Sequence, residues 1–340
     1  MTLESSSLEL EKLLAGKRSV AIISHFNPDG DACGSSMGLY SFLHSRGIHA
    51  EVVLPSRPPV FLDFLDKDRI TRYYTDDRDA ARQAVADSDL IVCLDFNRLD
   101  RTEWLQEDIT AAAAAKVMID HHPYPETEGF SIVISDPSSS STCELLYRTL
   151  MCFSSVAGVP ERIGKEALTA ITTGLLTDTN NFSNSLTPYT FTTAAGLLQA
   201  GADFESIGNM IFRRYTEDRM RLMGHLLLDS MEIDRNTGSS CMVLTLEDRE
   251  RFNFQDGDSE GLVNLPLMIK DVEVSAIFCE TKEFIRVSLR SKGNVSVNAL
   301  ANRYFNGGGH EKAAGGRLTI PISDVRRYFK ESMEQFLQHH

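Results

Sequence analysis

SVAIISHFNPDGDA, residues 19–32, is the stretch of sequence that decides the fold. Its first six residues are a short apolar run, and a histidine and a turn rich in Pro, Gly and Asp follow at once. An apolar run of this length predicts a strand buried on both faces, as in a parallel sheet. Helical sequence follows from about residue 33 and ends near Gly47, a residue type that often terminates helices. The stretch therefore predicts the first strand–turn–helix unit of an α/β domain.

The same alternation continues outward from this unit. Further buried strands are predicted at 90–94, 117–119 and 130–134, and helices at 80–86, 141–153 and 162–176. Later strands are predicted at 241–245, 272–279 and 284–289, before a closing amphipathic helix at 322–338. Alternating strands and helices favour a parallel sheet flanked by helices. We therefore expect an α/β parallel-sheet domain over 1–190, a helical connector over 191–228 and a smaller α+β domain over 229–340, with the active site in the interdomain cleft.

Composition limits the partners of the protein. The chain carries 48 Asp and Glu residues against 34 Lys and Arg, a formal net charge of −14 over 340 residues. A field of this sign argues against binding long nucleic acid through a broad basic surface, and a small anionic substrate would need local help such as metal ions. No apolar run approaches the roughly 18 residues of a membrane helix, and the start lacks a signal-peptide pattern, so we expect a cytoplasmic protein without membrane association. Six cysteines without CxxC spacing indicate neither a zinc site nor a disulfide framework.

Polar residues that can bind metals follow three of the predicted strands directly. His25 follows the first, Asp95 the second, and Asp120, His121 and His122 the third. Ligands of open α/β sheets collect beyond the carboxyl ends of the strands. The coincidence of three such strand ends therefore predicts a binding site there.

The turn after the first strand offers further ligands. Asp29 and Asp31 lie on one tight loop, so that one imidazole and two carboxylates can converge on cations. The alternative is a solvated turn with Asp31 as a helix N-cap. The adjacent histidines 121 and 122 face opposite ways if the backbone stays extended, so one would bind metal while the other faces substrate. A surface histidine pair is the alternative there.

Two more carboxylates complete the predicted ligand set. A carboxylate at the buried position of Asp95 is costly unless it is paired or binds a cation, and it could bridge two metals. Asp178 ends an apolar helix, where the alternative is a helix-terminal residue in a loop. The nitrogen and oxygen donors, without sulfur, favour Mn²⁺ or Mg²⁺ over structural zinc, with imidazole tilting the choice to Mn²⁺. Six ligands with one shared carboxylate suit two metals about 3.5–4 Å apart, an arrangement that activates water for in-line phosphoryl displacement. The six are His25, Asp29, Asp31, Asp95, His121 and Asp178.

A last cluster lies in the second domain. Arg290, Ser291 and Lys292 end a predicted strand, and Gly307-Gly308-Gly309-His310 follows. Consecutive glycines let backbone N–H groups approach an anion, and an arginine can form a bidentate contact with a phosphate. A flexible loop is the alternative for a lone glycine-rich turn. Together these residues predict a substrate pocket.

These motifs in this order resemble the DHH phosphoesterases, and the resemblance spans about residues 19–316. The matching residues are His25-Asn27-Pro28-Asp29-Gly30-Asp31 with Gly34-Ser35, Asp95, Asp120-His121-His122 and Asp178. The segment Gly307-Gly308-Gly309-His310 resembles the signature of the DHH-associated C-terminal domain. Chain length and residues 288–292 are most similar to the nanoRNase/pAp phosphatase (NrnA-type) branch.

The resemblance implies a role for each matching residue. His25, Asp29 and Asp95 would hold one Mn²⁺, and Asp31, Asp95, His121 and Asp178 the other, with Mg²⁺ or Co²⁺ as alternatives. His122 would face the phosphate while Asp120 orients its neighbours. Arg290 and His310 would bind the distal phosphate or nucleotide, together with Ser291 and Gly307, Gly308 and Gly309. Asn180 and Asn181 occupy positions where relatives often carry a glycine, a departure that concerns the shape of the pocket.

The expected function is hydrolysis of very short oligonucleotides and removal of the 3′-phosphate of 3′-phosphoadenosine 5′-phosphate (pAp). Long duplex nucleic acid is not an expected partner, whereas a homodimer that buries residues 194–198 is. The alternatives are a linear or cyclic dinucleotide phosphodiesterase, and a pyrophosphatase or exopolyphosphatase. A nucleotide-sensing module is the non-enzyme alternative, which metal-dependent turnover distinguishes from all of these.

Overall fold

The protein consists of two compact units, Met1–Arg214 and Tyr215–His340. The computed structural model describes residues 2–16, 19–213, 215–255 and 257–338. The expected connector, residues 191–228, is divided between the two units. Helices α7 (Pro188–Gln199) and α8 (Phe204–Phe212) pack against α5 (Thr142–Met151) and α6 (Lys165–Asp178) in the first unit, whereas α9 (Glu217–His225) starts the second.

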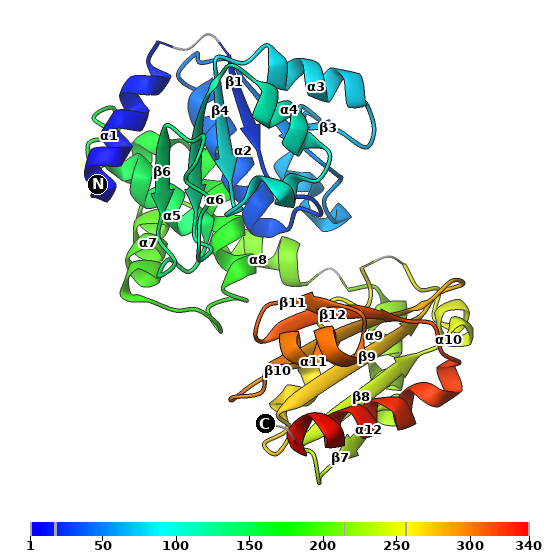
Figure 1. Cartoon of the computed structure of the whole chain (residues 1–340). Helices are drawn as coiled ribbons and strands as arrows, with labels where there is room; N and C mark the ends of the chain where they lie inside the picture. The colour runs from blue at the N-terminus through cyan, green and yellow to red at the C-terminus, as the bar shows by residue number, and fades with distance from the viewer. Residues whose placement is uncertain (1, 17–18, 214, 256, 339–340) are drawn as a thin grey trace. The chain divides into compact units, whose positions relative to one another are not determined.

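A parallel sheet of six strands forms the centre of the first unit, as the apolar runs predict (Figure 1). The strand order is β3-β2-β1-β4-β5-β6, and every neighbouring pair is parallel. The sequence missed two strands, β2 and β3, which lie on the edge side of β1. The strands are β1 (Val20–Ile23), β2 (Ala50–Leu54), β3 (Arg72–Tyr73), β4 (Leu90–Leu94), β5 (Ala115–Asp120) and β6 (Ile132–Ser135).

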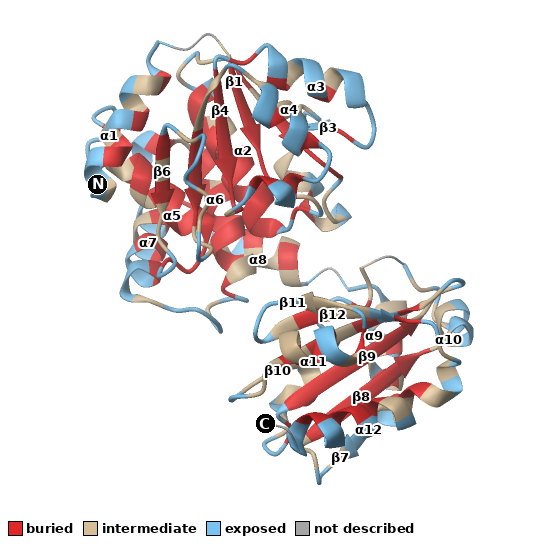
Figure 2. Cartoon of the chain, in the orientation of Figure 1, coloured by how far each residue is buried: buried red, intermediate tan, exposed pale blue. Residues whose placement is uncertain are grey.

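Helices cover both faces of this sheet, so the central strands β1 and β4 are completely buried (Figure 2). One face packs against α1 (Leu3–Leu14), α2 (Gly30–His44), α5 and α6. The other packs against α3 (Arg78–Ala86) and α4 (Leu105–Ala111). Short helical turns lie in the connections, namely η1 (Val60–Leu65), η2 (Leu99–Thr102) and η3 (Pro160–Ile163). The α/β class predicted for this domain is therefore confirmed.

The surface expected to form a homodimer is partly internal. Ala194 is 7% exposed and Leu197 is fully buried, because this side of α7 packs into the core of the first unit. Ala195 is exposed, and Leu198 is 55% exposed. Self-association through residues 194–198 would therefore use Ala195 and Leu198, and it stays a prediction.

The second unit is a mixed sheet with helices on both faces. Its strand order is β11-β12-β10-β9-β8-β7, with β8 and β9 parallel and the other pairs antiparallel. The α+β class predicted for this part is confirmed. One face packs against α11 and α12, and the other against α9, η4 and η5. The elements are β7 (Glu232–Asp234), β8 (Ser239–Leu244), β9 (Val274–Glu280), β10 (Ile285–Ser291), β11 (Gly308–Gly309), β12 (Ala313–Leu318), η4 (Leu226–Ser230), α10 (Leu246–Arg251), η5 (Leu262–Met268), α11 (Val297–Tyr304), η6 (Ile322–Asp324) and α12 (Val325–Gln338).

Two smaller observations bear on the sequence predictions. Within the described ranges, every helix is too short or too polar to cross a lipid bilayer. All six cysteines are free thiols, and five of them are buried.

Glycines let α2 and α6 cross at very close range. Gly30, Gly34 and Gly38 are spaced four apart and therefore share one face of α2. A Cβ at Gly34 would lie 2.6 Å from the Ala170 carbonyl oxygen and 2.8 Å from the Gly174 nitrogen. These are backbone atoms that have no rotamer with which to move aside. The close crossing brings the first turn of α2 against the carboxyl-terminal part of α6.

We expect Gly34→Ala to destabilise the first unit by about 1–3 kcal/mol, the usual cost of overpacking a tight contact. Gly208→Ala in α8 is the matched control, because a Cβ there meets no atom within 4 Å. That control should be neutral or slightly stabilising, since alanine favours a helix over glycine. Urea unfolding followed by circular dichroism measures both variants, and equal midpoints would contradict the packing argument.

Candidate functional site

Three adjacent strands place their carboxyl ends at one edge of the first sheet. In β1, β4 and β5, which neighbour one another, the chain continues into His25, Asp95 and the segment 120–122. The structure brings all six predicted metal ligands into overlapping groups within the described residues. In each group the donor atoms lie within 4.8 Å of one another: His25, Asp29 and Asp95; Asp95, His121 and His122; Asp31, His121 and Asp178.

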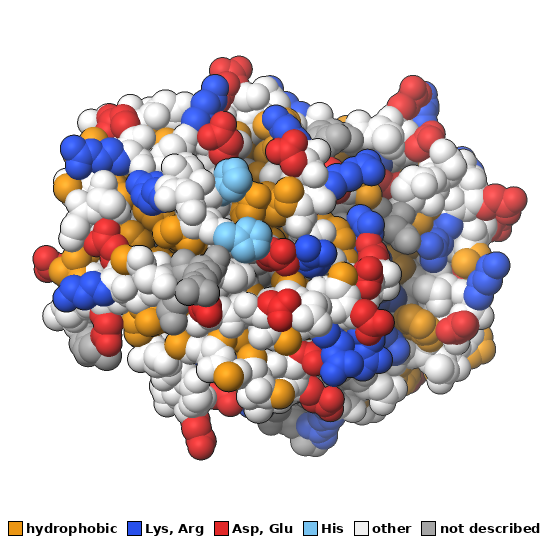
Figure 3. Space-filling model, turned by 90° about the horizontal axis from the view of Figure 1, so that it is seen from above, with side chains coloured by type: hydrophobic (Ala, Val, Ile, Leu, Met, Phe, Trp, Pro, Cys, Tyr) orange, Lys and Arg blue, Asp and Glu red, His pale blue; other side chains and the backbone are white. Residues whose placement is uncertain are grey.

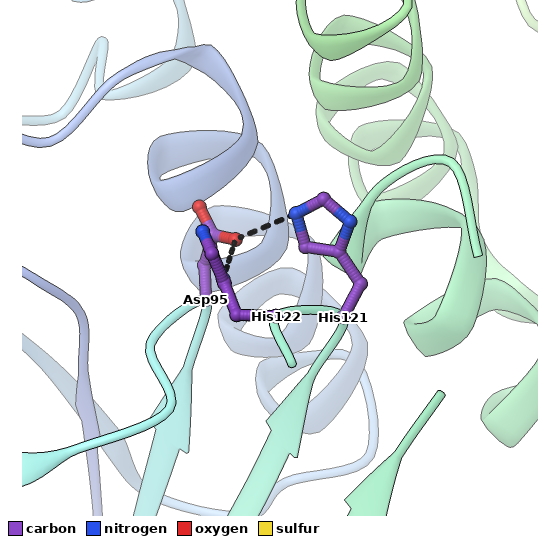
Figure 4. Close-up of side chains that lie close together, drawn as sticks. All are labelled: Asp95, His121 and His122. Carbon is purple, nitrogen blue, oxygen red and sulfur yellow. Dashed lines mark ion pairs between the residues drawn. The ribbon is translucent and has the colours of Figure 1, made fainter. Parts of the chain in front are cut away.

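Asp95 is the centre of this cluster (Figure 4). Its Oδ2 lies 3.5 Å from Nε2 of His25, and its Oδ1 lies 3.7 Å from Nε2 of His121 and 3.9 Å from Nδ1 of His122. The side chain is 3% exposed. Its backbone has φ +66°, a left-handed conformation that is uncommon outside glycine and that clusters at functional sites. The chain thus turns sharply at the end of β4 to hold a buried carboxylate among imidazoles.

The two aspartates of the first turn have different roles. Asp29 is the N-cap of α2, because its Oδ1 accepts the N–H groups of Asp31 and Ala32 at 2.9 and 3.1 Å. The alternative that Asp31 is the cap is therefore wrong. Asp31 lies in the first turn of α2 and is 2% exposed. Its carboxylate accepts hydrogen bonds from the start of α5, at the backbone nitrogens of Thr142 and Cys143.

The two histidines after β5 do not diverge as expected. The strand ends at Asp120, so the backbone is no longer extended, and both rings approach Asp95 with their centroids 4.7 Å apart. Nε2 of His121 also lies 3.6 Å from Oδ2 of Asp178, the last residue of α6. Asp120 is fully buried and accepts both Nδ1 and the backbone N–H of His122, at 2.7 and 3.0 Å. Asp120 therefore orients His122, as the resemblance implies.

Charge attraction decides the protonation of the imidazoles. Burial disfavours charging His25, but the contact with Asp95 outweighs burial and raises the pKa of His25 to about 9. Burial also lowers the pKa of His122, but the hydrogen bond to Asp120, together with the charges of Asp95 and Asp120, outweighs burial and raises this pKa. Burial alone would raise the pKa of Asp95, yet the bond from His25 and the charges of the neighbouring histidines lower it to about 2. Asp95 is therefore held as a carboxylate.

Charge repulsion acts on the other carboxylates. Burial and the charges of Asp95 and Asp178 raise the pKa of Asp31 well above its usual range. Burial also raises the pKa of Asp178 to about 7, with Asp95 adding to the shift and His121 opposing it. Crowded buried carboxylates are strained in this way unless a cation neutralises them. Since the donors are carboxylate oxygens and imidazole nitrogens, the site fits divalent cations such as Mn²⁺ or Mg²⁺.

The loop after Asp178 explains the departure at Asn180 and Asn181. Both residues have left-handed backbones, with φ +46° and φ +54°. Glycine and asparagine are the residues that adopt this conformation most readily. The conformation that glycine suits is therefore kept here by asparagine, which adds a side chain next to the cluster.

Sequence reasoning missed two parts of the site. The turn at residues 139–143 contacts three of the predicted ligands, and the only sequence signal was a serine-rich helix start. Arg101, at the end of η2, is exposed, and its charge opposes protonation of His122. It was missed because it lies six residues after Asp95 in an irregular connection.

In the second unit, Arg290 and Ser291 end β10. Nη1 of Arg290 donates to the Leu289 carbonyl at 2.9 Å, and burial lowers the pKa of this guanidinium. In the described part of the chain, Arg290 has no carboxylate partner. Ser291 is buried and donates to the Val295 carbonyl, while Nζ of Lys292 donates to the carbonyls of residues 267, 269 and 270. Arg290 is thus the cation of this segment with unused donors.

The glycine-rich segment is a short edge strand. Gly308 lies opposite Gly315 in the β11–β12 ladder. The N–H groups of Gly307 and Gly309 donate to the Ala301 carbonyl and to Oδ1 of Asn298. The expectation that these two N–H groups cradle an anion is therefore wrong. Glycine is needed instead for close backbone approach, because a Cβ at Gly309 would lie 2.6 Å from the Ala313 carbonyl oxygen. The exposed side chain of His310 follows directly.

The molecular surface agrees with an acidic protein. On the face shown in Figure 3, the described Lys and Arg side chains are interspersed with Asp and Glu, and no continuous basic area forms. Such a face does not offer the charged groove that long single strands require.

Known proteins match both units. Residues 19–175 match the DHH family, N-terminal domain, and residues 238–339 match the DHHA1 domain. The bifunctional oligoribonuclease and PAP phosphatase NrnA of Thermus thermophilus is 30% identical over 316 residues, covering 93% of this chain and 89% of that protein. The NrnA of Bacillus subtilis is 25% identical over 313 residues, covering 91% and 92%. The cyclic-di-AMP phosphodiesterase PdeA of Listeria monocytogenes is 24% identical, covering 97% of this chain but 49% of that protein.

Solved structures are similar as well. An exopolyphosphatase-related protein from Bacteroides fragilis superposes with a TM-score of 0.92 and 36% identity, covering 98% of this chain and 96% of that one. RecJ from Thermus thermophilus in complex with Mn²⁺ superposes with a TM-score of 0.54 and 13% identity, covering 99% and 55%. The latter likeness concerns the fold alone.

We expect Mn²⁺ to raise the unfolding temperature of the EDTA-treated protein, because an ion that binds only the folded state stabilises it by mass action. Asp95→Asn removes the charge shared by two donor groups and should lose most of this shift. Asp87→Asn is the control, since this exposed carboxylate merely ends α3. Differential scanning fluorimetry over a MnCl₂ series measures all three proteins. An undiminished shift in Asp95→Asn would contradict a metal site centred on Asp95.

Proposed function

We propose that this chain, which belongs to the DHH family of phosphoesterases and to its NrnA-type branch, hydrolyses very short oligonucleotides. We propose that it also removes the 3′-phosphate of pAp. The observation that carries the proposal is the convergence of six nitrogen and oxygen donors around the buried carboxylate of Asp95. A nucleotide-sensing module would not require so many buried acidic groups in one place. Hydrolysis of a phosphoester does, because cations held by such groups neutralise the negative charge of the transition state.

The proposed cofactor is a pair of divalent cations, Mn²⁺ by preference and Mg²⁺ or Co²⁺ as alternatives. His25, Asp29 and Asp95 would hold one, and Asp31, Asp95, His121 and Asp178 the other. Bound there, the pair would lower the pKa of water and stabilise the charge of an in-line displacement at phosphorus.

The chain's own residues position the reacting groups. Asp95 is kept ionised by its histidine neighbours and belongs to two of the three donor groups, one with His25 and Asp29 and one with His121 and His122. Asp120 fixes the ring of His122 through Nδ1, and we assign His122 to contact the scissile phosphate. Such a contact strengthens as charge develops on the phosphate oxygens.

We assign binding of the distal phosphate or nucleotide to the second unit. The guanidinium of Arg290 retains donors for a phosphate, and His310 is exposed directly after β11. Ser291, Gly307 and Gly309 would shape this segment, because the Ser291 hydroxyl and the two glycine N–H groups are engaged within the unit, and Gly308 is kept as a proposed substrate contact. The acidic balance of the chain favours small substrates over long strands.

The experiment that tests the function compares substrates side by side. The purified full chain is incubated with Mn²⁺ or with EDTA and given pAp, a 5′-phosphorylated diribonucleotide, a long RNA, pyrophosphate or polyphosphate. We expect Mn²⁺-dependent cleavage of the first two, with the long RNA left intact. Product analysis by ion-exchange chromatography measures each reaction.

Other outcomes point elsewhere. Cleavage of pyrophosphate or polyphosphate alone would favour the pyrophosphatase or exopolyphosphatase alternative, in line with the name of the similar Bacteroides fragilis protein. Cleavage of cyclic di-AMP in preference to the linear dinucleotide would favour the phosphodiesterase alternative. Absence of metal-dependent turnover with every substrate would leave the sensing module.

Two substitutions should separate catalysis from binding. Asp95→Ala removes a ligand from two of the three donor groups, so kcat on the dinucleotide should fall to background. His310→Ala removes a proposed substrate contact, so KM should rise about tenfold, the effect of losing roughly 1.4 kcal/mol of binding, while kcat changes little. Lys282→Ala, at another exposed position of the second unit, serves as the control. Steady-state kinetics that show full kcat in Asp95→Ala would rule out its shared role.

A further inference from the structure

We propose that the turn at residues 139–143 positions three of the metal ligands before any metal binds, two of them, Asp31 and Asp95, through Thr142. The inference rests on the proposed function of the site. None of the motifs that identified the ligands contains this turn. Under this proposal Thr142 is a positioning residue, because its hydroxyl and its backbone N–H bind the carboxylates of Asp95 and Asp31, which would bind the ions.

Asp31 is held by the start of α5. Its Oδ2 accepts the backbone N–H of Thr142 at 2.6 Å, and its Oδ1 accepts the backbone N–H of Cys143 at 2.9 Å. The first N–H groups of a helix have no acceptor within the helix, and they carry its positive dipole end. Both oxygens of Asp31 are therefore fixed in direction by a helix that follows it by more than a hundred residues.

Asp95 is held by the hydroxyl of the same residue. Oγ1 of Thr142 donates to Oδ1 of Asp95 at 2.9 Å, and Thr142 is fully buried. This is the oxygen that faces His121 and His122. The hydrogen bond from Thr142 therefore restricts how the Asp95 carboxylate is rotated.

His121 is held by the beginning of the turn. Nδ1 of His121 lies 3.2 Å from the carbonyl oxygen of Ser139. A carbonyl only accepts, so Nδ1 carries the proton, and Nε2 is left to face Asp95 and Asp178 as a donor atom for metal. The turn thus fixes two carboxylates and one imidazole tautomer.

The turn is itself anchored by buried and half-buried charged residues. Oε2 of the fully buried Glu144 accepts the backbone N–H and the hydroxyl of Ser140, at 3.2 and 2.6 Å, and the hydroxyl of Thr190 at 3.0 Å. Nη1 of Arg148 donates to the Ser139 hydroxyl and to Asp136, both at 2.9 Å. The turn is therefore held in place by the side chains of Glu144 and Arg148. Its hydrogen bonds to the three ligands form without metal.

The test uses three variants of the full chain, stripped of metal. Thr142→Val keeps the shape and removes the hydroxyl, whereas Thr142→Ser keeps the hydroxyl. Thr149→Val is the matched control, because Thr149 is equally buried in α5 and its hydroxyl has no hydrogen-bond partner among the described residues. Isothermal titration with MnCl₂ measures affinity directly, apart from turnover. We expect about 10–100-fold weaker binding in Thr142→Val, the usual cost of losing a group that orients a ligand. Thr142→Ser and Thr149→Val should bind like the unaltered protein.

The outcomes separate this proposal from the function on which it rests. Unaltered Mn²⁺ affinity in Thr142→Val, or an equal loss in Thr149→Val, would overturn the positioning role and leave the proposed function standing. Absence of Mn²⁺ binding in the unaltered protein would overturn both. If circular dichroism shows that Thr142→Val does not fold, Thr142→Ala replaces it with the same expected loss, and full affinity in that variant would overturn the proposal.

Discussion

The crowding of carboxylates at one edge of the first sheet is the constraint on which the rest of the structure depends. Asp31 and Asp95 are almost completely buried, and Asp178 ends a helix that reaches the same place. Burial, together with the repulsion of like charges that it strengthens, raises the pKa values of Asp31 and Asp178. Only a surrounding structure that is stable by other means can hold such a group of residues together. The apolar strands and the tight α2–α6 crossing supply that stability.

The α2–α6 crossing and the carboxylate cluster depend on the same small residues. A Cβ at Gly174 of α6 would lie 2.7 Å from Oδ1 of Asp31. The same small residues that let the helices approach therefore leave room for the carboxylate of Asp31. Stability and function depend on the same glycines, which explains why α2 is small-residue-rich along one face rather than filled with leucine.

The sequence predicted which side chains would gather in this cluster because strand ends are easy to recognise. Apolar runs such as 90–94 mark a buried parallel strand, and the residue after it lies at the carboxyl edge of the sheet by topology alone. The turn at residues 139–143 was missed because its contribution comes from backbone N–H groups, a carbonyl and one hydroxyl. Backbone donors cannot be recognised from residue types. Only the packing of α5 against α2 shows where these N–H groups point. The N–H groups of Gly307 and Gly309 were misjudged for a related reason, since sequence does not tell a free N–H from one bonded to a neighbouring helix.

The division of labour between the units explains which part of the function was predictable. Every proposed metal ligand lies between residues 25 and 178, inside the first unit, where geometry alone dictates the chemistry. In the proposed function, substrate choice falls to polar groups of the second unit such as Arg290 and His310, which would bind parts of a molecule rather than an ion. A phosphate is common to dinucleotides, pAp and polyphosphate, so an arginine that fits one fits all. Relatives that share the motifs can therefore bear names as different as oligoribonuclease and cyclic-di-AMP phosphodiesterase. Under the proposed function, the first unit would fix the chemistry at the reacting phosphorus, and a few side chains of the second would select the groups attached to it.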